Sequence, residues 1–451
     1  MLVLLGFSMI AVFLYLVISK RATPLVTLIV VPTAFGLIAG AGLGLSEMIL
    51  EAIVKLAPTA GLLFFAIIFF GTMIDVGLFD PVIRVILRFV GHHPTRLVVG
   101  TAFLTTIVSL DGDGSTTFII VTSALLPIYM RLGMSPVVLT VVAAMSNGVL
   151  NNVPWGGSTS RAAAALNVSP IDIFVPMIPS IVAGLAAVTV LAYFMGRGET
   201  KRIGALELTA SPGILVGSGW KSSVAITNTF AVPVAADGHD LVERPKARPR
   251  LIWVNLVLTL VVMTLLVVDV IEPVVVFMVA TAIVLIVNFP RVEEQSDQIK
   301  AHASSVISVV GMVFAASVLT GVMNGTGMVD AMAGWLVSII PPSLGPFMAT
   351  IAGVLSVPLT FIMTNDAFYF GVLPILSETA GHYGITPVEM ARASLAGQAL
   401  HQSSPLVASF LLLIGLANVN LGEHFRRVIW RGSIVAAVMI LMGGIFAFPL
   451  F

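Results

Sequence analysis

Cysteine is missing from this chain, and charged residues are scarce. Without cysteine the protein has no disulfide, no thiolate metal ligand and no thiol nucleophile. Only 10% of the residues are Asp, Glu, Lys or Arg, whereas 58% are hydrophobic. This leaves too little polar surface for a soluble protein of 451 residues, so the composition predicts a protein whose solvent is lipid.

Signatures of nucleic-acid binding and of catalysis are missing as well. The formal net charge is zero, which excludes the strongly basic field of a nucleic-acid-binding protein. The chain has no Walker A sequence for ATP, no HExxH metalloprotease motif and no Gly-x-Ser-x-Gly nucleophile elbow. We therefore expect a protein that is not an enzyme, and any transport that it performs should draw on an ion gradient.

Long apolar segments are what the chain has in abundance. A helix needs about 20 residues to cross a hydrocarbon core of about 30 Å. Ten segments come near this length: 1–19, 25–45, 57–79, 136–166, 172–196, 251–270, 273–290, 302–325, 387–416 and 432–450. The first segment lacks the basic start and the small-residue cleavage site of a signal peptide, so we expect it to remain as a span.

Two further apolar stretches, 95–131 and 343–378, are each long enough for two helices. Each is interrupted halfway by polar residues, Ser109–Ser115 in the first and Thr364–Asp366 in the second. This pattern is typical of a re-entrant helical hairpin, which enters and leaves the membrane by the same face. Because Lys and Arg collect on the cytoplasmic side, their positions predict a first hairpin entering from the cytoplasm and a second entering from outside.

The chain also resembles itself at a fixed offset. A shift of 251 positions aligns Gly133–Phe174 with Gly384–Phe425 without a gap, and the mid-span prolines Pro154 and Pro405 then coincide. Such an internal repeat with broken helices is the sequence signature of a secondary transporter.

The repeat predicts the domain organisation. We expect a first repeat at 1–196 and a second at 251–451, joined by a cytoplasmic linker at 197–250. Each repeat has five spans and a hairpin, and this odd number of spans inverts the second repeat. The predicted fold is therefore an all-α polytopic membrane protein with two inverted repeats, about ten transmembrane helices, two re-entrant hairpins and two broken helices.

Polar residues deep in these segments mark the candidate site. An Asp, Lys or Arg at the centre of a membrane helix costs about 2.5 to 3.5 kcal/mol in insertion measurements, so such residues need a functional or structural reason. They gather at the two hairpin tips and beside Pro154 and Pro405, where proline interrupts the helical hydrogen bonds.

The chemistry of these groups predicts two kinds of site. Carboxylates suit a hard cation or a proton, so the predicted metal or proton-coupling residues are Asp111, Asp113, Ser115, Asp366 and His401. Hydroxyls, amides, half-helix N-termini and a guanidinium suit a carboxylate-bearing anion. The predicted substrate-binding residues are Arg161, Asn151, Asn152, Gly156, Gly157, Ser158, Thr364, Asn365, Gln402, Ser403 and Ser404.

Each assignment has a structural alternative. Arg161 would instead pair with Asp111 or Asp113 for structure alone. Asp366 would cap the second helix of its hairpin, and His401 would be a packing residue.

At these residues the chain resembles the citrate-divalent metal:proton symporters, the bacterial Mg2+/Ca2+-citrate transporters of the ion transporter superfamily. The resemblance rests on the motifs Phe70–Asp80, Ser109–Phe118, Pro154–Gly157, Arg161–Ala165 and Asp366–Pro374. It implies uptake of citrate complexed with Mg2+ or Ca2+ together with protons, the cation being cargo and not a permanent cofactor. It further implies a multi-pass protein of the bacterial inner (plasma) membrane, a homodimer, and a site containing Asp111, Asp113, Arg161, Asn365 and Asp366.

Charge balance agrees with this resemblance. Citrate carries about three negative charges near neutral pH, and a divalent cation reduces them to about one, which Arg161 can match. Asp111 or Asp113 would hold the metal or carry the proton, so we expect the first repeat to handle most of the substrate charge. Two alternatives stay open, a Na+-coupled carrier of another di- or tricarboxylate and a membrane-embedded, metal-dependent enzyme acting on a lipid.

Overall fold

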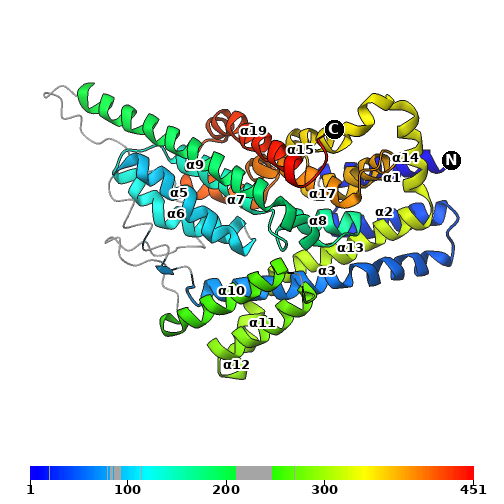
Figure 1. Ribbon diagram of the computed structural model, residues 1–451, viewed down its shortest axis with the longest axis horizontal. Coiled ribbons are helices and arrows are strands. Elements are labelled where there is room, and N and C mark those ends of the chain that lie inside the picture. The colour runs from blue at the N-terminus through cyan, green and yellow to red at the C-terminus, as the bar shows by residue number, and fades with distance from the viewer. Residues whose placement is uncertain are drawn as a thin grey trace.

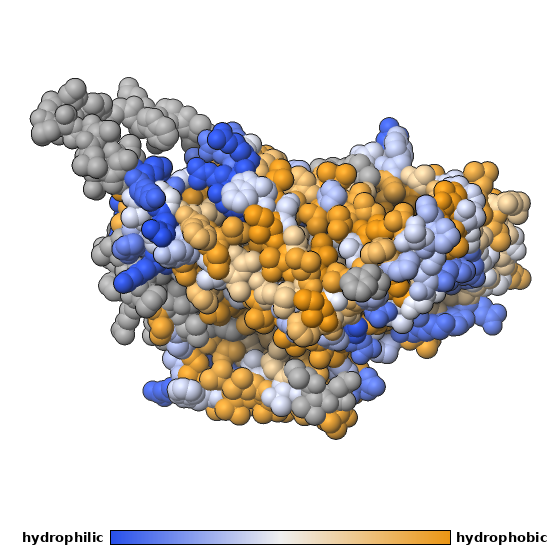
Figure 2. Space-filling model, turned by 45° about the horizontal axis from the view of Figure 1, so that its top comes forward, coloured by the Kyte–Doolittle hydropathy of each residue, from blue (hydrophilic) through white to orange (hydrophobic). Residues whose placement is uncertain are grey.

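The computed structural model describes residues 1–19, 21–78, 80–81, 85, 93–112, 114–209, 246–268 and 270–450. All regular secondary structure in these residues is helical (Figure 1), which confirms the all-α prediction. Seven of the described helices are long and apolar enough to cross a membrane. In Figure 2, apolar residues cover most of the visible face, as expected for a surface in contact with lipid.

The first half contains one hairpin and one broken helix. The hairpin is α5 with α6, which lie side by side, and the broken helix is α7 followed by α8. The helices are α1 (Leu2–Ile18), α2 (Pro24–Ile38), α3 (Gly44–Asp75), α5 (Pro94–Val108), α6 (Gly114–Arg131), α7 (Pro136–Leu150), α8 (Gly157–Leu166) and α9 (Pro170–Thr209).

The second half also contains a hairpin followed by a broken helix. The hairpin is formed by α15 and α16, and the broken helix by α17 and α18. The helices are α10 (Ile252–Val268), α11 (Pro273–Asn288), α12 (Val292–Ala301), α13 (Ala303–Gly325), α14 (Met328–Ile339), α15 (Met348–Ile362), α16 (Leu373–Gly381), α17 (Pro387–Ala396), α18 (Ala408–Ala417) and α19 (Leu421–Phe446).

The two halves interlock instead of standing side by side. Helix α3 packs along α13, and α9 packs along α19, so each long helix of the first half has a partner in the second. The first hairpin lies between α7 of its own half and α18 of the other, and the second hairpin lies between α17 and α8. Each hairpin therefore packs against both broken helices, that of its own half and that of the opposite half.

Two helices were not predicted. The apolar helix α14 has 12 residues, which is below the length needed for a span, and it packs on α1 through an edge-on contact between Trp335 and Phe7. Helix α12 is polar and lies between the predicted spans 273–290 and 302–325. It forms because Gln298 is buried against α3 and donates a hydrogen bond of 2.6 Å to Asp75.

Helix α9 is much longer than its apolar segment. It was expected to end at residue 196, but it continues to Thr209, inside the predicted linker, of which residues 210–245 lie outside the described residues. The polar extension is held by Glu199, whose carboxylate accepts hydrogen bonds from the Ser135 backbone at 2.9 Å and from Arg202 at 2.7 Å. Arg202 also donates a hydrogen bond of 2.6 Å to the Gly133 carbonyl oxygen. Because this bond and the Ser135 bond tie the extension to the start of α7, the helix continues where hydropathy predicts a linker.

We expect Glu199→Ala to loosen this junction. The change removes the acceptor of the Ser135 amide and leaves Arg202 without its carboxylate, a loss of about 1 to 2 kcal/mol. Thermal unfolding of the purified protein in detergent should show a lower midpoint. As a control, Glu378→Ala removes an exposed carboxylate in α16 and should leave the midpoint unchanged, so equal midpoints for both variants would contradict this account.

Candidate functional site

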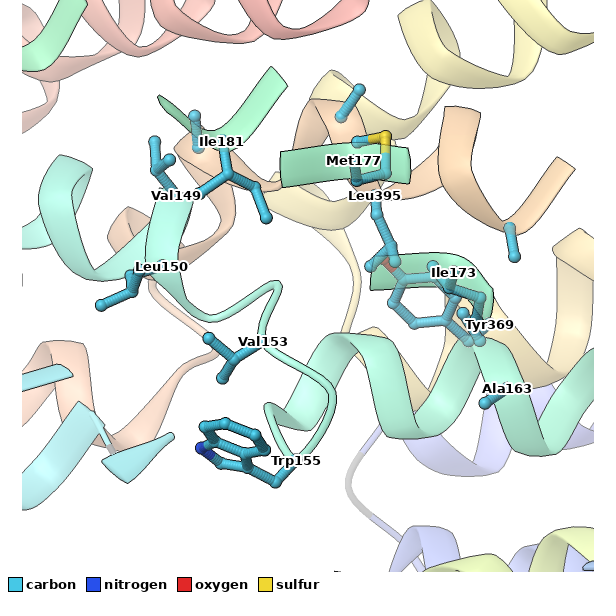
Figure 3. Close-up of a cluster of buried hydrophobic side chains, with 14 of the residues drawn as sticks. Val149, Leu150, Val153, Trp155, Ala163, Ile173, Met177, Ile181, Tyr369 and Leu395 are labelled. Atoms are coloured by element: carbon cyan, nitrogen blue, oxygen red, sulfur yellow. The ribbon is translucent and has the colours of Figure 1, made fainter. Parts of the chain in front are cut away.

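The first helix break is a loop of six residues between α7 and α8. Figure 3 shows the chain leaving the helix at Leu150, passing Val153 and Trp155 as a loop and turning helical again before Ala163. A Cβ atom at Gly156 would collide with the carbonyl oxygen of Asn151, so only glycine allows this loop to close. The first residue of α8 is Gly157, whose amide donates to the side-chain oxygen of Asn151 at 3.2 Å.

The second break has a different shape. Helix α17 tightens into a 3₁₀ segment at Gly397–Ser403, after which the chain passes Ser404 and enters α18. Here His401 and Ser404 face the second hairpin. The Nδ1 atom of His401 lies 2.7 Å from the carbonyl oxygen of Thr360, and the Ser404 hydroxyl donates to the carbonyl oxygen of Phe361 at 2.6 Å. These two side chains satisfy backbone groups of α15 and so hold the hairpin against the break.

The first hairpin tip contacts the first break. A 3₁₀ turn at Ser109–Asp111 forms the tip, and the Trp155 indole donates to the carbonyl oxygen of Leu110 at 2.8 Å. Asp113 lies outside the described residues, as does the side chain of Asp111, while Ser115 takes part in polar interactions within α6 or its neighbours. The predicted roles of Asp111, Asp113 and Ser115 stay predictions.

The second hairpin tip consists of Thr364, Asn365 and Asp366. The Thr364 hydroxyl accepts from the Ala367 amide at 3.2 Å and so caps the helix that follows. A stretch of π-helix follows at Ala367–Val372, and such stretches are frequent at functional sites. Asn365 and Asp366 are both buried, with relative exposures of 9% and 8%.

Ser158 lies at the centre of a buried polar cluster formed by both halves. Its hydroxyl donates to the side-chain oxygen of Gln398 at 3.0 Å and accepts from the side-chain amide of Asn365, also at 3.0 Å. On the same loop, Asn152 donates to the carbonyl oxygen of Leu395 at 3.3 Å. The cluster therefore joins the first break to the second hairpin tip and the second break.

One ion pair belongs to this cluster. The Nε atom of Arg161 lies 2.5 Å from the Oδ1 atom of Asp366, and a terminal nitrogen of Arg161 donates to the carbonyl oxygen of Gly157 at 2.7 Å. The side chains are 23% and 11% exposed. The sequence-based alternatives considered only Asp111 and Asp113 as partners of Arg161, whereas the observed partner comes from the other half. The chain fold brings it there, because α8 packs on the second hairpin.

Contacts at the two breaks match across the 251-residue offset. The amide of Asn151 lies 3.5 Å from the Ser158 hydroxyl, and the side-chain oxygen of Gln402 lies 3.5 Å from the Ser409 hydroxyl. At the same offset Gly114 corresponds to Asn365, and Ser409 corresponds to Ser158. A Cβ atom at Gly114 would lie 2.8 Å from the Ser409 hydroxyl, just as the Asn365 side chain contacts the Ser158 hydroxyl. The two helix breaks thus have corresponding contacts with the hairpin tips, but the first hairpin has glycine where the second has asparagine.

Sequence reasoning missed Gln398, Ser409 and His424. The repeat pairs Asn147 with Gln398 and Ser158 with Ser409, so it held the signal for the first two. His424 is fully buried in α19, where its ring nitrogens lie 3.0 Å from the Thr140 hydroxyl and 3.2 Å from the Ser403 hydroxyl. Because it joins segments far apart in the sequence, no local pattern indicated it.

The described residues contain no group of three or more His, Asp or Glu side chains arranged to hold a metal ion.

Residues 6–397 match the model of a family described as citrate transporter. The chain belongs to the citrate transporter family. Within the family's range of sequences it is similar to two proteins of Bacillus subtilis (strain 168). A citrate transporter is 46% identical over 451 residues, covering 99% of this chain and 100% of the relative. A Mg(2+)/citrate complex secondary transporter is 44% identical over 450 residues, covering 99% of each chain.

The fold of this citrate transporter family member is shared with a solved structure. The YdaH transporter of Alcanivorax borkumensis, described as having an unusual topology, superposes with a TM-score of 0.60 at 13% identity, covering 89% of this chain and 88% of that one. At this identity the likeness shows the fold alone. Together with the apolar helices, the family makes this chain a multi-pass membrane protein and a transporter, and the predicted resemblance is confirmed at the level of the family.

Proposed function

We propose that this protein takes up citrate complexed with a divalent cation, of the Mg2+ or Ca2+ type, across the bacterial inner membrane together with protons. The observation that carries the proposal is the Arg161–Asp366 pair in the buried cluster between the halves. A guanidinium is suited to hold a substrate carboxylate, and a carboxylate beside amide oxygens is suited to a hard cation. A single cluster thus offers groups for both parts of a metal-citrate complex.

Family membership supports the choice of substrate. One relative is named a citrate transporter and another a Mg(2+)/citrate complex secondary transporter, and each aligns along nearly the whole chain. We propose that the halves are inverted repeats and that the hairpins, with the broken helices α7–α8 and α17–α18, move against α3 and α13 to expose the cluster to either side.

Uptake of labelled citrate into proteoliposomes tests the function. We expect uptake to rise at least ten-fold when Mg2+, Ca2+ or another divalent ion is added, and to rise again when the inside is alkaline. Uptake that follows a Na+ gradient and ignores the proton gradient would replace this proposal with the Na+-coupled carrier. Liposomes containing the protein that take up no more citrate than empty ones under every condition would refute it.

A further inference from the structure

The ion pair at the site has a consequence for how substrate binds. Arg161 and Asp366 are in direct contact, so the positive charge that a substrate carboxylate would need is already neutralised by the protein. A carboxylate of citrate that binds the guanidinium therefore competes with Asp366 for its positive charge and for the donor at Nε. Arg161 itself is positioned for this exchange, because its hydrogen bond to the Gly157 carbonyl oxygen holds the guanidinium at the start of α8.

The displaced carboxylate would remain in a buried position. Asp366 is 8% exposed, and an unpaired charge at this depth is costly. It therefore needs a new positive partner at the moment when the substrate binds. A divalent cation carried by the substrate is such a partner, whereas metal-free citrate brings only further negative charge.

A second, independent observation is an unpaired oxygen atom on Asn365, the residue next to Asp366 in the chain. Within the described part of the chain, the Oδ1 atom of Asn365 is buried and has no hydrogen-bond partner. Buried polar atoms are nearly always paired, so this unpaired oxygen indicates a ligand, and oxygen is the ligand atom that Mg2+ and Ca2+ prefer.

We propose that Asp366 is the residue through which the site requires a metal. A carboxylate of the substrate replaces Asp366 on Arg161, and the released carboxylate binds the divalent cation of the substrate together with the Oδ1 atom of Asn365. No covalent bond changes. The exchange replaces the Arg161–Asp366 ion pair with two others, one between Arg161 and the substrate carboxylate and one between Asp366 and the cation. This inference rests on the proposed function, and it adds that the metal requirement resides in one exchangeable pair and not in a preformed metal site.

Citrate binding to the purified protein in detergent, measured with and without Mg2+ by titration calorimetry, tests the exchange. We expect the wild type to bind citrate at least ten-fold more tightly with Mg2+. Asp366→Asn frees Arg161 and removes the charged metal ligand, so metal-free citrate should bind about ten-fold more tightly than to the wild type, and Mg2+ should change its affinity less than two-fold. Glu378→Gln, an exposed carboxylate on α16, is the control and should behave like the wild type.

A second variant covers the case in which Asp366→Asn does not fold. Asn365→Ser removes the Oδ1 ligand and leaves the Arg161–Asp366 pair in place, so the Mg2+ concentration for half-maximal stimulation should rise about ten-fold while metal-free binding stays unchanged. Full Mg2+ stimulation in Asp366→Asn, or an unchanged Mg2+ requirement in Asn365→Ser, would overturn the exchange. If the wild type binds citrate under neither condition, the proposed function fails instead.

Discussion

Replacing Arg161 with alanine is expected to abolish citrate binding and uptake. The guanidinium is largely buried, is fixed by the Gly157 carbonyl oxygen and is the cationic member of the pair at the centre of the cluster. The pair that this change removes from the complex is the one between Arg161 and a substrate carboxylate. Truncating one member of a buried, hydrogen-bonded charge pair costs about 2 to 5 kcal/mol, and about 2.8 kcal/mol corresponds to a hundred-fold loss of affinity. We therefore expect calorimetry to show a loss of at least a hundred-fold, and proteoliposome uptake to fall to the level of empty liposomes.

Two comparison variants separate loss of binding from loss of fold. Arg161→Lys keeps the charge but not the planar fork of donors, so it should retain weak binding. Arg431→Ala removes an arginine of α19 that lies over the Trp430 ring and contacts no residue of the cluster, and it should leave citrate affinity unchanged. Wild-type affinity in Arg161→Ala would remove this residue from the site.

Introducing leucine at Gly148 is expected to destabilise the protein and stop transport. Gly148 lies on α7 where it crosses the 3₁₀ segment of the second break. A Cβ atom there would lie 2.9 Å from the carbonyl oxygen of Ala399 and 3.1 Å from that of Gln398. These are backbone atoms that cannot turn aside, so a larger side chain forces the two breaks apart. Overpacking of this kind costs about 1 to 3 kcal/mol, occasionally more.

Thermal unfolding in detergent and citrate uptake measure this effect together. A matched control is Gly334→Leu, because a Cβ atom at Gly334 in α14 meets no other atom within 4 Å. That variant should unfold at the temperature of the wild type and transport normally. If Gly148→Leu is as stable and active as Gly334→Leu, the close crossing of the two breaks is not needed for function.

The helices were predictable where hydropathy alone decides them. The predicted apolar segments form α1, α2, α10, α11 and α13. Lipid offers no hydrogen-bond partners, so the backbone of such a segment must form its hydrogen bonds within a helix. Hydropathy did not predict the helices that are stabilised by contacts with other helices. Gln298 and Glu199 are polar residues buried by neighbouring helices. They stabilise α12, which lies outside every predicted span, and the extension of α9, which lies in the predicted linker.

The site was predictable in its parts and not in its pairing. Polar residues in apolar segments indicated Arg161, Asn365 and Asp366 because each is too costly to bury without a reason. Which groups meet was decided only by the fold: α8 packs on the second hairpin, so Arg161 contacts Asp366 from a position 205 residues away in the chain. The expectation that the first repeat handles most of the substrate charge stays a prediction, since the side chains of Asp111 and Asp113 lie outside the described residues. The charge pair between Arg161 and Asp366 has one member in each half.

By itself, the sequence determined that this protein lives in lipid, that it is helical and where its helices break, because composition, segment length and proline act locally. Only the tertiary structure decided that each hairpin packs against the broken helix of the opposite half as well as its own, because this contact depends on how α7, α8, α17 and α18 cross. The chemistry of each side chain determines the free energy of burying it in a membrane. The packing of the helices determines which partner compensates for that free energy.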